Sequence, residues 1–271
     1  MELQAWRAIA TSVTGTSHQK TNKPCQDSHR LEILTQVGPL VILIASDGAG
    51  SASRSEEGST RACQELLDNI RLYVEEGGRL SDVTRELAAD WIENAAEAVQ
   101  LVADQENTPI REFACTLLAA VVADDHALFL QIGDGAIVFW AHGEDDWCIA
   151  SWPQHGEYLN TTRFLTEPES RRVFEFTSTA KPIYEVAVFT DGIESLVLHY
   201  ASQTVHSPFF EAMFPVVRES ETSGLNAVLS DQLGRYLASP TVTERSDDDI
   251  TLLMATRFKV PPSRALVPVE E

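Results

Sequence analysis

The sequence predicts an α+β fold, a four-layer αββα sandwich in which two antiparallel sheets pack face to face and a helix pair covers each outer face. Apolar runs of strand length follow one another directly instead of alternating with helices, and the helical patterns come in pairs. The chain has 271 residues and is 44% hydrophobic, which is enough for one large core. We therefore expect one domain at residues 1–257, followed by a poorly ordered tail at 258–271 that contains three prolines.

The first quarter of the chain predicts three strands and a helix. Residues 6–13 alternate apolar and polar side chains, a pattern typical of a half-buried strand. The polar stretch 15–27 contains Gly, Ser, Asn and Pro, so we expect a loop there. Strands at 30–35 and 40–45 follow, separated by a Gly-Pro pair. A helix is expected at 56–74, because apolar residues recur every four positions along one face.

The middle of the chain predicts a second helix and then a succession of strands. The helix is expected at 81–103, with Ser81 as its N-cap and an apolar face that continues along its length. A Gly-Gly pair separates it from the first helix. Short apolar runs then follow closely and predict antiparallel strands at 114–122, 127–132, 136–140 and 147–152.

The last part of the chain begins with a long irregular segment. Residues 153–168 are polar and without a period, and this length suggests a functional flap. Patterns typical of strands and helices return afterwards. They predict strands at 172–176 and 186–189, helices at 209–217 and 225–237, and a closing strand at 250–257.

The composition excludes several classes of protein. A net charge of −21 disfavours binding to nucleic acid or to an anionic membrane. The sequence has no apolar run of about 18 residues and no basic segment followed by an apolar one at its start. Its four cysteines are scattered without C-x-x-C spacing, as in reduced proteins. We expect a cytoplasmic protein that binds neither nucleic acid nor membrane.

Three apolar runs end in an Asp-Gly pair, with the aspartates at Asp47, Asp134 and Asp191. A fourth acidic cluster at 247–249 precedes another apolar run. If these strand ends converge, their carboxylates repel one another and favour a hard divalent cation. Asp-Gly is also the preferred pair of a tight hairpin turn. That alternative is strongest at Asp134, because the runs on either side of it look like two arms of a hairpin.

Six short motifs resemble those of a known family in their order and spacing. The order resembles that of the metal-dependent protein phosphatases of type 2C, in particular their bacterial branch, over residues 7–257. The motifs are Cys25-Gln26-Asp27, Ala45-Ser46-Asp47-Gly48-Ala49-Gly50, Ala114-Cys115-Thr116-Leu117, Ile132-Gly133-Asp134-Gly135, Phe189-Thr190-Asp191-Gly192-Ile193-Glu194 and Asp248-Asp249-Ile250-Thr251.

The resemblance implies a metal centre and a role for each matching residue. Two Mn²⁺ or Mg²⁺ ions are implied, with a third weaker ion possible. Asp47 would bridge the two ions, and the backbone carbonyl of Gly48 would bind one of them. Asp191 and Asp248 would bind the second ion. Asp134 would bind the third ion, and Asp27 would orient a metal-bound water.

The sequence departs from the family pattern at positions that concern the substrate. Eukaryotic members have an arginine that binds phosphate where this chain has Asn22, and a histidine where it has Ala49. We expect His18 to replace the phosphate-binding group, because it lies in a flexible loop next to the first motif. The further candidates are Lys20, Lys23 and Arg54. The register of the last motif leaves Asp248 or Asp249 as the ligand.

The implied function is hydrolysis of phosphoserine and phosphothreonine in proteins by a metal-activated water. The resemblance also implies a cognate Ser/Thr kinase as a partner. One alternative is a catalytically weak or inactive scaffold with the same fold that binds a phosphoprotein or another partner. A second alternative is a metal-dependent hydrolase of a small phosphoester.

Overall fold

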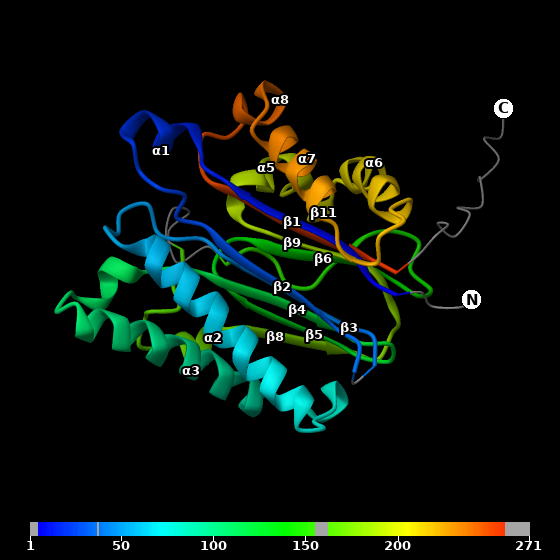
Figure 1. Cartoon of the computed structure of the whole chain (residues 1–271), viewed down its shortest axis with the longest axis horizontal. Coiled ribbons are helices and arrows are strands. Elements are labelled where there is room, and N and C mark those ends of the chain that lie inside the picture. Colours follow the sequence, from blue (N-terminus) through cyan, green and yellow to red (C-terminus); the bar gives the residue numbers. More distant parts are fainter. Residues whose placement is uncertain (1–4, 37, 155–161, 258–271) are drawn as a thin grey trace.

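The computed structural model describes residues 5–36, 38–154 and 162–257. Two sheets pack face to face at its centre, and helices cover both outer faces (Figure 1). This arrangement confirms the predicted αββα sandwich. No helix in the described ranges has the length and apolar character needed to cross a membrane.

One sheet has six strands in the order β12-β1-β13-β9-β6-β7. Its neighbouring strands are antiparallel, except that β1 and β12 run parallel. In chain order the strands are β1 (Arg7–Val13), β6 (Ala136–Ala141), β7 (Cys148–Ile149), β9 (Ile183–Phe189), β12 (Gly224–Leu225) and β13 (Ile250–Thr256).

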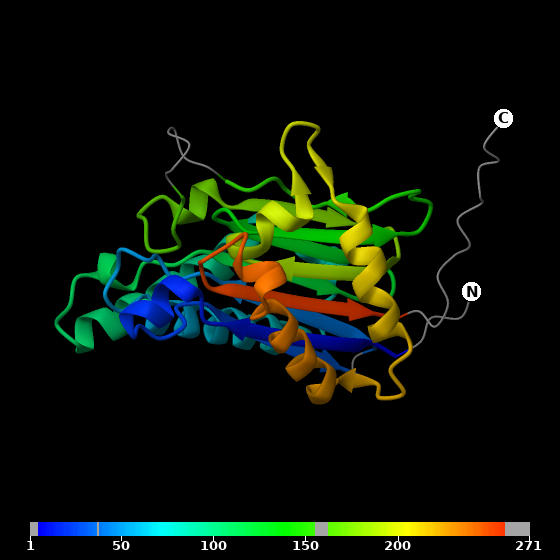
Figure 2. The same cartoon turned by 90° about the horizontal axis from the view of Figure 1, so that it is seen from above.

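The other sheet has five antiparallel strands in the order β2-β3-β4-β5-β8. They are β2 (Ser28–Leu34), β3 (Leu40–Ser46), β4 (Leu117–Val122), β5 (Ala127–Ile132) and β8 (Glu175–Thr179). A separate short hairpin, β10 (Leu198–His199) and β11 (Thr204–Val205), projects from the body of the molecule and is yellow in Figure 2.

A helix pair covers each sheet. Helices α2 (Ser55–Glu75) and α3 (Arg85–Gln105) lie over the five-stranded sheet, and α6 (Ser207–Arg218) and α7 (Ala227–Leu237) lie over the six-stranded sheet. Short helical segments connect the larger elements. They are α1 (Thr16–Thr21), η1 (Leu80–Asp82), η2 (Ile110–Phe113), α4 (Ser170–Val173), η3 (Asp191–Ile193), α5 (Glu194–Val197) and α8 (Pro240–Thr243).

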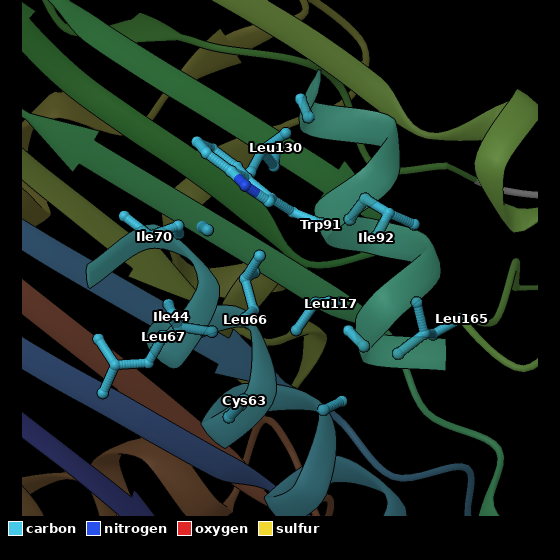
Figure 3. Close-up of a cluster of buried hydrophobic side chains, with 14 of the residues drawn as sticks. Ile44, Cys63, Leu66, Leu67, Ile70, Trp91, Ile92, Leu117, Leu130 and Leu165 are labelled. Atoms are coloured by element: carbon cyan, nitrogen blue, oxygen red, sulfur yellow. The ribbon is translucent and has the colours of Figure 1, made fainter. Parts of the chain in front are cut away.

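Strand β3 shows why the apolar runs become central strands. Its side chains alternate between two cores, because successive residues of a strand face opposite sides of the sheet. Ile42 and Ile44 pack against α2 and α3, whereas Val41 and Leu43 pack against the other sheet. Figure 3 shows side chains of the first of these cores, among them Ile44 beside Leu66 and Leu67 of α2. The sequence of a strand that is buried on both faces is therefore a continuous apolar run.

Three local predictions were wrong. The expected loop at 15–27 contains helix α1. Helix α3 begins at Arg85 with Thr84 as N-cap, whose side chain accepts a hydrogen bond from the Leu87 N–H, instead of beginning at Ser81. The strand expected at 172–176 is displaced, because 170–173 form helix α4 and the strand begins at Glu175.

Candidate metal centre

Three aspartates from three connections meet at one end of the sandwich. Asp47 follows β3, Asp191 follows β9, and Asp134 lies between β5 and β6. One carboxylate oxygen from each of the three lies within 4.8 Å of the others. Since β3 and β9 belong to different sheets, the face-to-face packing of the sheets is what brings these carboxylates together.

The hairpin alternative for Asp134 is wrong. Strand β5 belongs to the five-stranded sheet and β6 to the six-stranded sheet, so the Gly133–Gly135 segment crosses between sheets. A Cβ added at Gly135 would lie 2.5 Å from the Phe189 carbonyl oxygen. A Cβ at Gly192 would overlap the carbonyl oxygen of Asp249. In these two Asp-Gly pairs, glycine allows one backbone to approach another at the site.

The carboxylates have acceptor atoms that the protein leaves unpaired. Within the described residues, Asp27 Oδ1, Asp134 Oδ1, Asp191 Oδ1 and Glu194 Oε1 are buried and have no hydrogen-bond partner. Buried polar atoms are normally paired, so each of these atoms is an exception that needs an explanation. Oxygen donors of this kind fit Mg²⁺ or Mn²⁺. The residues present therefore fit a divalent metal centre.

The pKa values of the site reflect burial and mutual repulsion. Burial is the main cause that raises the pKa of Asp191 to about 8, and the nearby charges of Asp134 and Asp248 raise it further. Burial, together with Asp27 and Asp191, raises the pKa of Asp47 well above its ordinary value. Such carboxyl groups hold protons when no cation is near, and a divalent cation provides the charge that lets them ionise.

Asp27 is buried behind these groups. Its Oδ2 accepts a hydrogen bond from the Thr190 hydroxyl at 2.8 Å, and Thr190 Oγ1 accepts one from the Thr251 N–H at 2.9 Å. Burial raises the pKa of Asp27 to about 7. Across the site, Thr116 Oγ1 accepts a hydrogen bond from the Asp47 N–H at 2.8 Å. Thr190, after β9, thus connects the six-stranded sheet to Asp27, just before β2 of the five-stranded sheet, whereas Thr116 and Asp47 join neighbouring strands of the five-stranded sheet.

Asp248 and Asp249 have different surroundings. Asp249 is 2% exposed, and its carboxylate accepts hydrogen bonds from the Gly15 N–H at 2.7 Å and the Gln26 N–H at 2.6 Å. Asp248 is exposed, and its charge contributes to the raised pKa of both Asp47 and Asp191. Asp249 thus holds neighbouring loops in place, whereas the Asp248 carboxylate accepts a hydrogen bond only from the adjacent Asp249 N–H, at 2.8 Å, among the described residues.

His18 is placed differently from a free phosphate-binding group. It lies on α1, its side chain is 10% exposed, and its Nδ1 is 3.0 Å from Asp249 Oδ2. The neighbouring arginine candidate is also paired, since Arg54 forms ion pairs with Glu57 and Glu106. The phosphate-binding role of His18 stays a prediction.

The sequence reasoning missed Glu194 and Thr162. Glu194 lies three residues after Asp191 at the start of α5, and burial together with the charge of Asp134 raises its pKa to about 8. Glu194 could have been found from its position three residues after Asp191, because residues at this spacing lie on the same side of a helical turn. The Thr162 hydroxyl donates a hydrogen bond to Asp134. Thr162 belongs to the expected flap at 153–168, of which residues 155–161 lie outside the described part.

The comparisons with known proteins agree with this geometry. The family model "Protein phosphatase 2C" matches residues 14–237. The chain is 36% identical over 257 residues to Serine/threonine-protein phosphatase 3 of Escherichia coli, which covers 93% of this chain and 98% of that protein.

Solved structures show the same fold. Serine/threonine phosphatase Stp1 from Staphylococcus aureus matches with a TM-score of 0.58 and 15% identity, over 94% of this chain and 97% of that one. A sex-determining protein of C. elegans matches with a TM-score of 0.63 and 11% identity, over 94% of this chain and 66% of that one. The converging carboxylates, the family model and the identity to the E. coli phosphatase lead to one conclusion: the chain belongs to the protein phosphatase 2C family.

Proposed function

We propose that this protein is a metal-dependent serine/threonine protein phosphatase. Its family membership and its 36% identity to an E. coli serine/threonine phosphatase support this function. The observation that carries the proposal is the convergence of Asp47, Asp134 and Asp191, with unpaired buried oxygens on Asp134 and Asp191. Phosphoryl transfer depends mainly on positioning and on charge neutralisation, and this cluster can position the cations that neutralise charge.

In this proposal Asp47, the Gly48 carbonyl, Asp191 and Asp248 hold two Mn²⁺ or Mg²⁺ ions, and Asp134 holds a third. When bound, such ions activate a water and neutralise charge on the phosphoryl group. The donor set, which is oxygen only, supports these ions over softer metals. Glu194 adds a further carboxylate beside Asp134.

Asp27 would orient the attacking water as a hydrogen-bond acceptor. Its Oδ2 already accepts from Thr190, while its buried Oδ1 has no hydrogen-bond partner in the described residues. Thr190 fixes the Asp27 carboxylate close to Asp47, and the charge of Asp27 raises the pKa of Asp47. We propose phosphorylated proteins as substrates and a cytoplasmic Ser/Thr kinase as the opposing enzyme.

The test is Mn²⁺-dependent release of phosphate from a phosphothreonine peptide. We expect turnover by the wild type that a chelator abolishes and that falls at least about a hundredfold in Asp191→Asn. Asp231→Asn, which removes the charge of an exposed aspartate on α7, is the matched control and should behave like the wild type.

Two other results would each replace the proposal. A folded wild type that binds Mn²⁺ and phosphopeptide without turnover would support a scaffold. Faster turnover of nucleotides than of phosphopeptides would support a hydrolase of small phosphoesters.

A further inference from the structure

The negative charge of this protein is unfavourable for binding a phosphorylated substrate. The chain carries a net charge of −21, and the metal centre itself is built from carboxylates. A phosphate dianion is repelled at long range by such a surface. A cationic side chain at the rim of the site would offset this repulsion with charge-assisted hydrogen bonds to the phosphate.

Most basic side chains around these loops are already neutralised by acidic partners. Arg54 is paired with Glu57 and Glu106 on the α2 side, and Arg163 is paired with Glu167 in the flap segment. His18 lies against Asp249. Each of these would have to give up its contact with a carboxylate to bind substrate.

Lys23 has a different environment. Its side chain is exposed, and its Nζ donates a hydrogen bond to the Gly50 carbonyl oxygen at 3.2 Å. Gly50 lies three residues after Asp47, and Lys23 lies four residues before Asp27. The ammonium group therefore bridges the two loops that carry these residues. Among the described residues it has no carboxylate partner, and two of its three N–H donors have no acceptor.

The turn at the end of α1 explains how Lys23 reaches this position. Asn22 ends the helix in the left-handed conformation, with φ of 54°, which asparagine tolerates better than most residues. The Lys23 N–H then donates to the His18 carbonyl oxygen at 3.0 Å. The helix itself is held against the rim, because the Ser17 N–H donates to the Asp247 carbonyl oxygen at 2.9 Å. Figure 1 shows α1 at the end of the sandwich where β13 begins.

We propose that Lys23 binds the phosphoryl group of the substrate at the rim of the metal centre. This inference rests on the proposed phosphatase function and assigns a substrate-binding residue to it. A lysine suits the position because its flexible stem can exchange an exposed hydrogen bond to a neutral carbonyl for a charge-assisted one to phosphate. Asn22, which stands where eukaryotic members of the family have an arginine, caps the C-terminus of α1 and does not take over the role of that arginine.

The test compares Lys23→Gln, Lys23→Arg and Lys181→Gln in steady-state kinetics on a phosphothreonine peptide with saturating Mn²⁺. Lys181 is a matched control, since it is exposed, pairs with Glu144 and lies just before β9, at the other end of that strand from Asp191. We expect Lys23→Gln to raise KM, and the inhibition constant of inorganic phosphate, about tenfold, with kcat within about twofold of the wild type. Lys23→Arg should restore most of the affinity.

Three results would overturn the inference. If Lys23→Gln and Lys181→Gln are indistinguishable, Lys23 does not bind substrate, and the phosphatase function stands. If Lys23→Gln lowers kcat and shifts the half-saturating Mn²⁺ concentration with KM unchanged, Lys23 only supports the loop at Gly50. If the wild type shows no metal-dependent turnover that Asp191→Asn removes, the phosphatase function fails and the inference fails with it.

Discussion

At the scale of single residues, the adjacent aspartates Asp248 and Asp249 have different roles. The buried Asp249 carboxylate accepts backbone hydrogen bonds from Gly15 and Gln26, and so joins the α1 segment to the start of β13. The exposed Asp248 carboxylate accepts a hydrogen bond from the adjacent Asp249 N–H at 2.8 Å and adds negative charge to the cluster. The carboxylate oxygens that hydrogen bonds already occupy are poorly placed to bind a metal as well.

The first prediction separates these two residues. Asp249→Ala should lower the free energy of unfolding by about 2–4 kcal/mol, because two buried N–H groups lose their acceptor. Asp248→Ala should leave unfolding nearly unchanged and raise the Mn²⁺ concentration needed for half-maximal activity. Urea unfolding in chelator and a Mn²⁺ titration measure the two effects. If instead Asp248→Ala destabilises the protein and Asp249→Ala raises the Mn²⁺ requirement, Asp249 is the metal ligand.

The second prediction concerns pH in the metal-free protein. The folded-state pKa is about 7 for Asp27 and about 8 for Asp191, both far above the values of unfolded carboxyl groups. The unfolded chain therefore loses its protons first as pH rises, and the stability of the folded state falls between about pH 4 and pH 8.

Thermal unfolding at a series of pH values measures this effect. In chelator, the Tm of the wild type should fall across this range, and Asp191→Asn should reduce the slope. Saturating Mn²⁺ should remove most of the slope, because the bound ions lower the pKa values of the carboxyl groups and keep them ionised over most of this range. A Tm in chelator that is constant or rises up to pH 8 would contradict the raised pKa values.

At the scale of elements, the turn after β9 is the most constrained part of the site. Within a few residues it contains Asp191, the 3-10 segment η3 and Glu194 at the start of α5. Gly192 in this turn lies directly against the Asp249 backbone. The turn and the start of β13 can therefore pack together only when position 192 lacks a side chain.

The third prediction tests this contact. Gly192→Ala should destabilise the protein by about 1–3 kcal/mol and weaken Mn²⁺ binding, because the Asp191 turn must move away from Asp249. Thr84→Ala removes the N-cap of α3 and should cost a similar amount, about 1 kcal/mol, with Mn²⁺ binding unchanged. Chemical unfolding and isothermal titration with Mn²⁺ compare the two. Equal Mn²⁺ affinities in both variants would show that the turn tolerates the displacement.

At the scale of the whole molecule, the last strand closes the sandwich at the end opposite the metal centre. Arg257, just after β13, is fully buried and donates from Nε to the Ile183 carbonyl oxygen at 2.6 Å. Its guanidinium lies 4.9 Å from the centre of the Trp6 ring and pairs with Asp124 at 2.7 Å. These contacts hold the chain at Arg257 in the buried interior of the domain, and the end of the domain at residue 257 stays a prediction.

The fourth prediction follows from these contacts. A chain ending after Arg257 should keep the Tm of the full chain within about 2 °C and retain Mn²⁺-dependent turnover, because the removed residues lie beyond the buried contacts described above. A chain ending after Thr256 should lose stability, since the Arg257 contacts are lost with it. Circular dichroism melting compares the three lengths. A large loss on removing 258–271 alone would show that the tail is part of the domain.

The sequence by itself determined the layers and the candidate carboxylates. Central strands such as β3 are apolar throughout because both of their faces are buried, so the pattern identifies them without knowledge of their neighbours. The Asp-Gly pairs at Asp47 and Asp191 are also recognisable from the sequence. In each of them a charged residue and a glycine directly follow an apolar run that predicts a buried strand. Helices α2 and α3 follow from the four-residue spacing of their apolar faces.

Only the tertiary structure decided how these parts meet. Helix α1 forms in a polar segment because the distant Asp247 and Asp249 accept hydrogen bonds at its start, which no local pattern encodes. The chain passes between sheets at Asp134, although its flanking runs would equally suit a hairpin. Asp249 differs from Asp248 because its carboxylate contacts Gly15 and Gln26, which lie more than 200 positions away in the chain. Local propensity depends on neighbours in the chain, whereas a site at converging strand ends depends on neighbours in space.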